Sequence, residues 1–153
     1  MNLLPHPVHF ESIETFYFSW LCDKCGKDKL TSGTHVMRIL LKVEAEISQA
    51  DGLHKLENKR ELLERILDEN SGKSLHENHF LLTGAREKLI QTIMAQRSNI
   101  KEPKENLRLL EYQVQLFKKV AQVMTKVDLP RDFWDQTQTK MEKELAEAKE
   151  NIG

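Results

Sequence analysis

The chain is poor in several kinds of residue, and each scarcity excludes a class of protein. It has only two cysteines in 153 residues, so it is not a small domain held together by several disulfides. No apolar run approaches the roughly 18 residues that span a bilayer, so no membrane association is expected. The formal net charge is −1, so the basic excess typical of nucleic-acid-binding proteins is missing, and no nucleic-acid partner is expected.

Charged residues are abundant at 31%, and hydrophobic residues make up 39%, which is the balance of a soluble, helix-rich protein. The first residues, Met1–Pro7, lack the basic and apolar regions of a signal peptide. We therefore expect an intracellular, reducing location, in the cytoplasm or the nucleus. There a close cysteine pair is present as thiols or as metal ligands rather than as a disulfide.

Five amphipathic patterns follow one another after residue 31. They predict helices over residues 32–49, 53–70, 78–98, 103–126 and 131–151. The short loops between them imply antiparallel neighbours. The expected fold is all-α, a helical bundle or TPR-like array of about five helices. Ser32 and Asn78 are suitable N-caps, Gly72 is placed to close the second helix, and Pro103 stands in the first turn of the fourth.

The apolar positions of these patterns give the expected core. They recur at helical spacing in each segment, and the last helix turns strongly polar after Leu145, which favours a surface position for its end. The expected core residues are Val36, Ile39, Leu40, Val43, Ile47, Leu56, Leu62, Leu63, Ile66, Leu67, Phe80, Leu81, Leu82, Ala85, Leu89, Ile93, Met94, Leu107, Leu110, Val114, Phe117, Val120, Ala121, Met124, Phe133, Trp134, Met141 and Leu145.

The first 31 residues form an expected N-terminal head, separate from a helical domain over residues 32–153. We expect this head to be irregular, with a short strand around residues 16–18. It contains the only two cysteines, Cys22 and Cys25, spaced C-x-x-C and followed by Gly26. A tight C-x-x-C turn directs two sulfurs at one ion, so the pair predicts half of a zinc site. A thioredoxin-like redox motif would need a βαβ context, which is not readable here.

A structural zinc site needs four ligands. His6 and His9 are also two residues apart, and twelve residues separate His9 from Cys22. Together the four side chains would complete a Cys2His2 zinc site within the chain. The alternative is that two surface histidines next to prolines fall at this spacing by chance.

No catalytic constellation is visible in the sequence, and we expect no catalytic residue. There is no G-x-S-x-G motif and no glycine-rich phosphate loop. His76 and His79 flank Glu77, which resembles a metal or acid–base cluster. We favour a simpler interpretation, in which both histidines lie at the start of a helix and hydrogen-bond neighbouring backbone groups.

The order of the short motifs resembles a known family. The segment Trp20-x-Cys22-x-x-Cys25-Gly26 precedes two amphipathic helices, and Leu75-His76-x-Asn78-His79-Phe80 precedes a leucine-rich pair. This order is similar to the region after the SET domain in SET and MYND domain (SMYD) proteins, especially the arthropod type. In that family a W-x-C-x-x-C-G knuckle leads into a TPR-like domain with an L-H-P-N-H-[FY] segment. Glu77 stands where the family usually has proline.

The resemblance implies a protein-lysine methyltransferase that uses S-adenosylmethionine and structural zinc. Only Cys22 and Cys25 match family zinc ligands, because the upstream C-x-x-C pair has no counterpart; His6 and His9 do not match family ligands. The SET core and the MYND cysteine array also have no counterpart in this chain. We therefore expect a C-terminal fragment, a truncated product or a shortened paralogue.

Three hypotheses follow. The first is a helical protein-interaction module without methyltransferase activity, whose partner is a protein. A SET domain or another chain would then complete the zinc site. The second is a self-contained zinc-binding structural domain. The third is a fragment of an active S-adenosylmethionine-dependent enzyme, for which S-adenosylmethionine is a cofactor only of the full-length protein.

Overall fold

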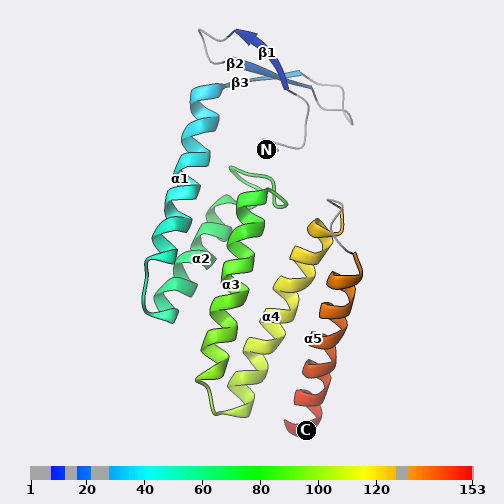
Figure 1. The fold of residues 1–153 in the computed structure, drawn as a ribbon. Helices are drawn as coiled ribbons and strands as arrows, with labels where there is room; N and C mark the ends of the chain where they lie inside the picture. Colours follow the sequence, from blue (N-terminus) through cyan, green and yellow to red (C-terminus); the bar gives the residue numbers. More distant parts are fainter. Residues whose placement is uncertain (1–7, 13–16, 22–27, 127–130, 153) are drawn as a thin grey trace.

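The computed structural model of the chain describes residues 8–12, 17–21, 28–126 and 131–152. In this part of the chain a small sheet precedes five helices, which follow one another as antiparallel hairpins (Figure 1). The predicted all-α array is confirmed for the helical part of the chain. The helices are α1 (Gly33–Asp51), α2 (Leu56–Asn70), α3 (Phe80–Ser98), α4 (Pro103–Met124) and α5 (Arg131–Ile152).

The helix ends follow local signals in the sequence. Gly72 has φ 71° directly after α2, in the left-handed region that favours glycine at the end of a helix. Pro103 begins α4, where its missing N–H would have had no partner within the helix. The sequence predicted Asn78 as the N-cap of α3, but the N-cap is His79, one residue later.

The N-terminal head differs from expectation, because its described residues form three strands rather than one. They are β1 (Val8–Ser12), β2 (Tyr17–Leu21) and β3 (Asp28–Ser32), paired antiparallel in the order β1-β2-β3. The expectation rested on the aromatic run alone, whereas pairing between neighbouring segments satisfies the backbone groups of all three. Among the described elements, only α1 contacts the sheet, through β2 and β3.

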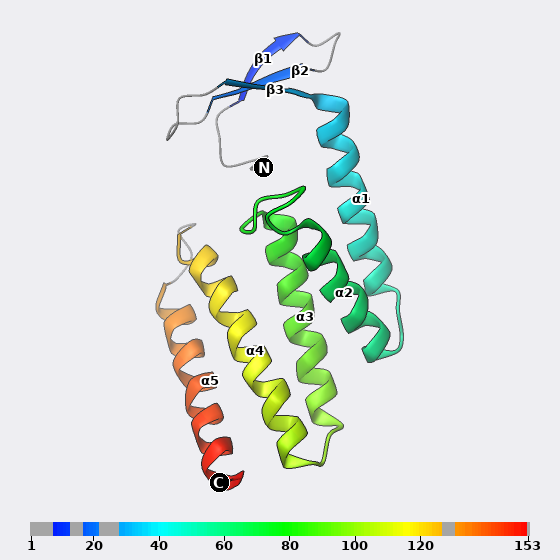
Figure 2. The same ribbon diagram turned by 180° about the vertical axis from the view of Figure 1, so that it is seen from behind.

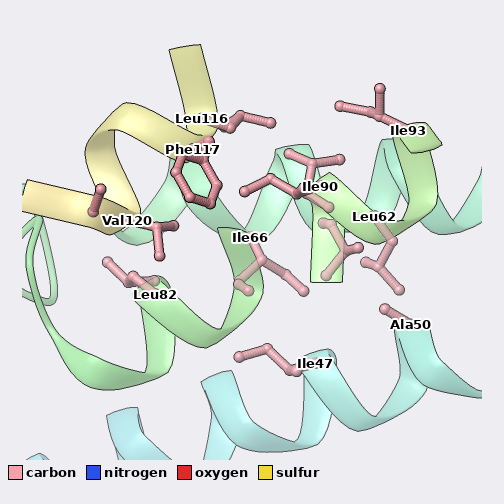
Figure 3. Close-up of a cluster of buried hydrophobic side chains, with 14 of the residues drawn as sticks. Ile47, Ala50, Leu62, Ile66, Leu82, Ile90, Ile93, Leu116, Phe117 and Val120 are labelled. Atoms are coloured by element: carbon pink, nitrogen blue, oxygen red, sulfur yellow. The ribbon is translucent and has the colours of Figure 1, made fainter. Parts of the chain in front are cut away.

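The core lies where α3 is packed between α2 and α4 (Figures 1 and 2). Apolar side chains from α1, α2, α3 and α4 converge there, including Ile47 of α1, Ile66 of α2, Leu82 of α3 and Val120 of α4 (Figure 3). The side chains that are almost completely buried are Val43, Leu63, Ile66, Leu75, Leu82, Leu89, Ile93, Leu110 and Val120.

Three large residues that we expected in the core are instead exposed. Phe80 is 67% exposed, Met94 52% and Phe133 57%. Phe80 is the first residue of α3 and stacks on the ring of His79, with ring centroids 4.6 Å apart. Phe133 lies edge-on against Trp134, and it is Trp134 that reaches the core, near Phe117. None of the described helices is long and apolar enough to cross a membrane.

Candidate functional site: the groove between helices α2 and α4

Most of the predicted zinc ligands lie outside the described residues. This applies to His6, Cys22 and Cys25, whereas His9 lies in β1, where it is paired with Ser19 of β2. The described residues contain no group of three or more potential metal ligands. The zinc site therefore stays a prediction.

His76 and His79 have structural roles at the start of α3. The backbone N–H of Asn78 donates to Nδ1 of His76 at 3.0 Å, and the N–H of Leu81 donates to Nδ1 of His79 at 3.1 Å. This confirms the interpretation that both rings hydrogen-bond neighbouring backbone groups. His79 is 4% exposed, and its burial, together with the nearby His76, lowers the pKa of its imidazole.

A groove runs between α2 and α4, with α3 as its floor. Because each helix is antiparallel to the next, α2 and α4 run in the same direction on either side of α3 (Figure 2). We call this feature the α2–α4 groove, and it contains two hollows. The first, of about 280 Å³, is the Arg86 hollow, lined by Glu64, Leu67, Asp68, Ser71, Arg86, Tyr112, Gln115, Leu116 and Lys119. The second, of about 570 Å³, is the Ile100 hollow, lined by Leu56, Glu57, Arg60, Gln96, Asn99, Ile100, Glu105, Arg108 and Leu109.

Three polar side chains separate the two hollows and link α2 to α4. Nε of Arg60 donates to Oε1 of Glu64 at 2.8 Å, and the Tyr112 hydroxyl donates to Oε2 of the same carboxylate at 3.1 Å. The Arg60 guanidinium also lies 5.3 Å from the centre of the Tyr112 ring, a cation–π distance. Burial and the adjacent Glu64 carboxylate raise the pKa of Tyr112 to about 12, so its hydroxyl remains a hydrogen-bond donor at neutral pH.

Arg86 lies at the floor of the Arg86 hollow and is only 5% exposed. Its Nη1 donates to the backbone oxygen of Glu77 at 2.7 Å, and its Nη2 donates to Oγ of Ser71 at 3.3 Å. These bonds fasten the loop between α2 and α3 to the first half of α3. Burial lowers the pKa of the guanidinium, and the Glu77 carboxylate opposes that shift.

The polar residues of this groove were not predicted from the sequence, although one of them carries a signal. Arg86 follows Leu82 by four positions and precedes Leu89 by three, so a charge stands on the apolar stripe of α3. A charge on such a stripe indicates either a buried structural ion or a binding site. The contact between Glu64 and Tyr112 joins residues 48 positions apart and has no comparable signal in the sequence.

No protein-family model, curated protein or solved structure matches the chain. The resemblance to SMYD proteins therefore rests on the motifs of the sequence alone.

Proposed function

We propose that this chain is a helical protein-interaction module that binds an extended segment of a partner protein in the α2–α4 groove. The observation that carries the proposal is the pair of hollows along one groove between parallel helices. Both hollows combine apolar side chains with charged groups, as in Leu116 beside Lys119 and Ile100 beside Arg108. This combination suits a peptide, whose side chains alternate between apolar anchors and polar groups.

The motif order that resembles SMYD proteins supports the same proposal. It implies that the helical region corresponds to the TPR-like domain of those enzymes, and that the segments for methyl transfer have no counterpart here. We therefore expect no methyl transfer when the chain is incubated with radiolabelled S-adenosylmethionine and candidate protein substrates. Label in a substrate would instead support the third hypothesis, an active methyltransferase.

The direct test is an unbiased selection of binding peptides from a displayed random library, followed by NMR mapping on the ¹⁵N-labelled chain. We expect the selected peptides to shift amide signals of α2, α3 and α4 that border the two hollows. Gln115 is exposed at the Arg86 hollow, so Gln115→Trp should fill the hollow and weaken binding.

Gln136→Trp is the matched control, because Gln136 is exposed on α5 and lines neither hollow. It makes the same chemical change and should leave binding unchanged. Peptides that bind with equal affinity to both variants, or that shift signals only outside the groove, would refute the proposed site.

A second function, zinc binding by the head, is favoured by the register of the sheet. Leu21 at the end of β2 pairs with Asp28 at the start of β3, so the sequence Cys22-x-x-Cys25 falls in the connection between two paired strands. Val8 begins β1 opposite Trp20, at the same end of the sheet. In the sequence, His6 precedes Val8 by two positions and Cys22 directly follows Leu21, so the candidate ligands flank strand ends that lie at one end of the sheet.

The zinc-to-protein ratio after dialysis against metal-free buffer tests this second function. About one zinc per chain would support a Cys2His2 site, and His6→Ala and His9→Ala should then lower the ratio. A ratio near zero would refute zinc binding by the isolated chain. About one half would indicate that two chains share an ion through their cysteine pairs.

A further inference from the structure

Arg86 is a buried cation without a paired anion among the described residues. None of their carboxylate oxygens lies within salt-bridge distance of its guanidinium, and its two partners are a backbone oxygen and a hydroxyl. A guanidinium has five N–H donors, so three remain without a partner from these residues. Burying a charge is costly unless it is paired, and this cost favours a ligand that supplies the anion.

The charges around the Arg86 hollow favour an anion with a single charge. Glu64 also lines the hollow, but Arg60 already neutralises it at 2.8 Å. Among the residues that line the hollow, Asp68 then opposes Arg86 and Lys119, which leaves one net positive charge. The Glu77 carboxylate also acts on Arg86, but it does not line the hollow. Asp68 is exposed at the hollow, so it would repel a doubly charged phosphate more strongly than a carboxylate.

We propose that Arg86 binds a carboxylate of the partner peptide, and that the Ile100 hollow takes an apolar side chain of the same peptide. This inference rests on the proposed function of the α2–α4 groove. The planar fork of a guanidinium matches the two oxygens of a carboxylate, which explains why an arginine suits this position. Leu56, Ile100 and Leu109 supply apolar surface in the second hollow.

The separation of the hollows fixes the spacing of the two peptide side chains. The residues of α2 and α4 that line one hollow lie about eight to ten positions from those that line the other. At a helical rise of about 1.5 Å per residue, this is about 12 to 15 Å along the groove. An extended peptide advances about 3.3 Å per residue, so the apolar and acidic residues should be about four positions apart.

Blocked peptides with one leucine and one glutamate four positions apart, joined by serine and glycine, test this inference. Peptides with leucine before glutamate and with glutamate before leucine are both needed, because the direction of the bound chain is not fixed. In a further arm, a shorter peptide ends in a free α-carboxylate in place of the glutamate side chain. The matched control has glutamine in place of glutamate. We expect at least one direction to bind at least about tenfold more tightly than its glutamine control, because hydrogen bonds to charged groups are strong.

Among the protein NMR signals that shift when the peptide binds, we expect the side-chain Nε–H signal of Arg86. Tighter binding of the internal glutamate would assign the site to an acidic side chain, and tighter binding of the free end would assign it to a chain terminus. Equal affinities of the glutamate and glutamine peptides would overturn the carboxylate inference while leaving the groove function intact. Failure of every designed peptide would also overturn it, because the library selection tests the groove independently.

Substitutions at the hollow give a second readout. Asp68→Asn removes a repulsive charge from an exposed position, so it should tighten binding of the glutamate peptide about two- to fivefold. Lys119→Gln should weaken it by a similar factor, and neither should change binding of the glutamine peptide. Arg86→Lys retains the charge but loses the fork, so it should weaken glutamate binding about tenfold or more. Tighter binding after Lys119→Gln would contradict the proposed polarity of the hollow.

Discussion

The centre and the C-terminal edge of the helix array are held by different interactions. In α3, Leu82, Leu89 and Ile93 are fully buried between α2 and α4. In the described part of α5, Met141 is the one buried residue. Ion pairs also hold α5 against its neighbours, including Arg97–Glu144 at 2.8 Å and Lys149–Glu111 at 3.5 Å. Ion pairs at a surface contribute little stability, so the edge should separate from the array more readily than the centre.

Truncating a central side chain should have the largest effect on stability. Leu89→Ala leaves a cavity at a fully buried position, and we expect it to lower the free energy of unfolding by about 2–5 kcal/mol. Met141→Ala at the edge should cost less, because that site is nearer to solvent and can relax. Chemical denaturation followed by far-UV circular dichroism measures both. An equal cost for the two variants would remove the distinction between centre and edge.

Acidification should weaken the centre through His79. The pKa of this histidine is lowered in the folded state, so the unfolded chain binds the additional proton more readily. The stability that it contributes is complete above the unfolded pKa of about 6.5 and falls as the pH decreases below that value. Each pKa unit between the folded and unfolded values corresponds to about 1.4 kcal/mol in the free energy of unfolding. Denaturation at a series of pH values from neutral to mildly acidic measures this loss.

His79→Asn separates this effect from other titrations. Asparagine is a good N-cap and does not titrate, so α3 should keep its cap while the histidine contribution disappears. The stability of this variant should therefore fall less on acidification than that of the unchanged chain. An identical pH profile for the two proteins would assign the pH dependence to other groups.

Removing the Tyr112 hydroxyl should have a smaller effect, on the link between α2 and α4. Tyr112→Phe loses the 3.1 Å hydrogen bond to Glu64, and we expect a loss of about 1 kcal/mol. Arg60 still pairs with Glu64, which limits the cost. An ultraviolet titration should also lose the tyrosine step at about pH 12. If that step persists in the variant, its assignment to Tyr112 is wrong.

The ion pairs of α5 should give the smallest effects. Glu144→Gln and Lys149→Gln should each lower the free energy of unfolding by less than about 1 kcal/mol. Glu144→Gln should have the larger effect, because its partner Arg97 is only 14% exposed. Denaturation at low and high salt tests the cause, since screening should reduce both effects. A larger loss than that from Leu89→Ala would reverse the comparison between edge and centre.

The sequence predicted the helices well because their signals are local. The apolar period and the positions of Gly72 and Pro103 depend on neighbouring residues, so four of the five helix starts lay within one or two residues of those observed. The start of α2 was three residues off, at residue 53 rather than Leu56. The exposure of Met94 was missed because a run of apolar residues does not indicate which faces of a helix have neighbours.

The candidate site was less predictable from the sequence. The completion of the zinc site by His6 and His9 was inferred from spacing alone, and His9 is the one candidate ligand that lies in a described strand. Neither the α2–α4 groove nor its division by Arg60, Glu64 and Tyr112 was inferred, because each depends on contacts between separate helices.

By itself the sequence determined where helices form and where they end, because backbone preference, capping and apolar period act within a few residues. The tertiary structure alone decided that α2 and α4 lie along one groove and that the Arg86 guanidinium faces a hollow between them. Those properties depend on distances between residues far apart in the chain. Such distances are fixed only when the apolar faces of the helices pack against one another.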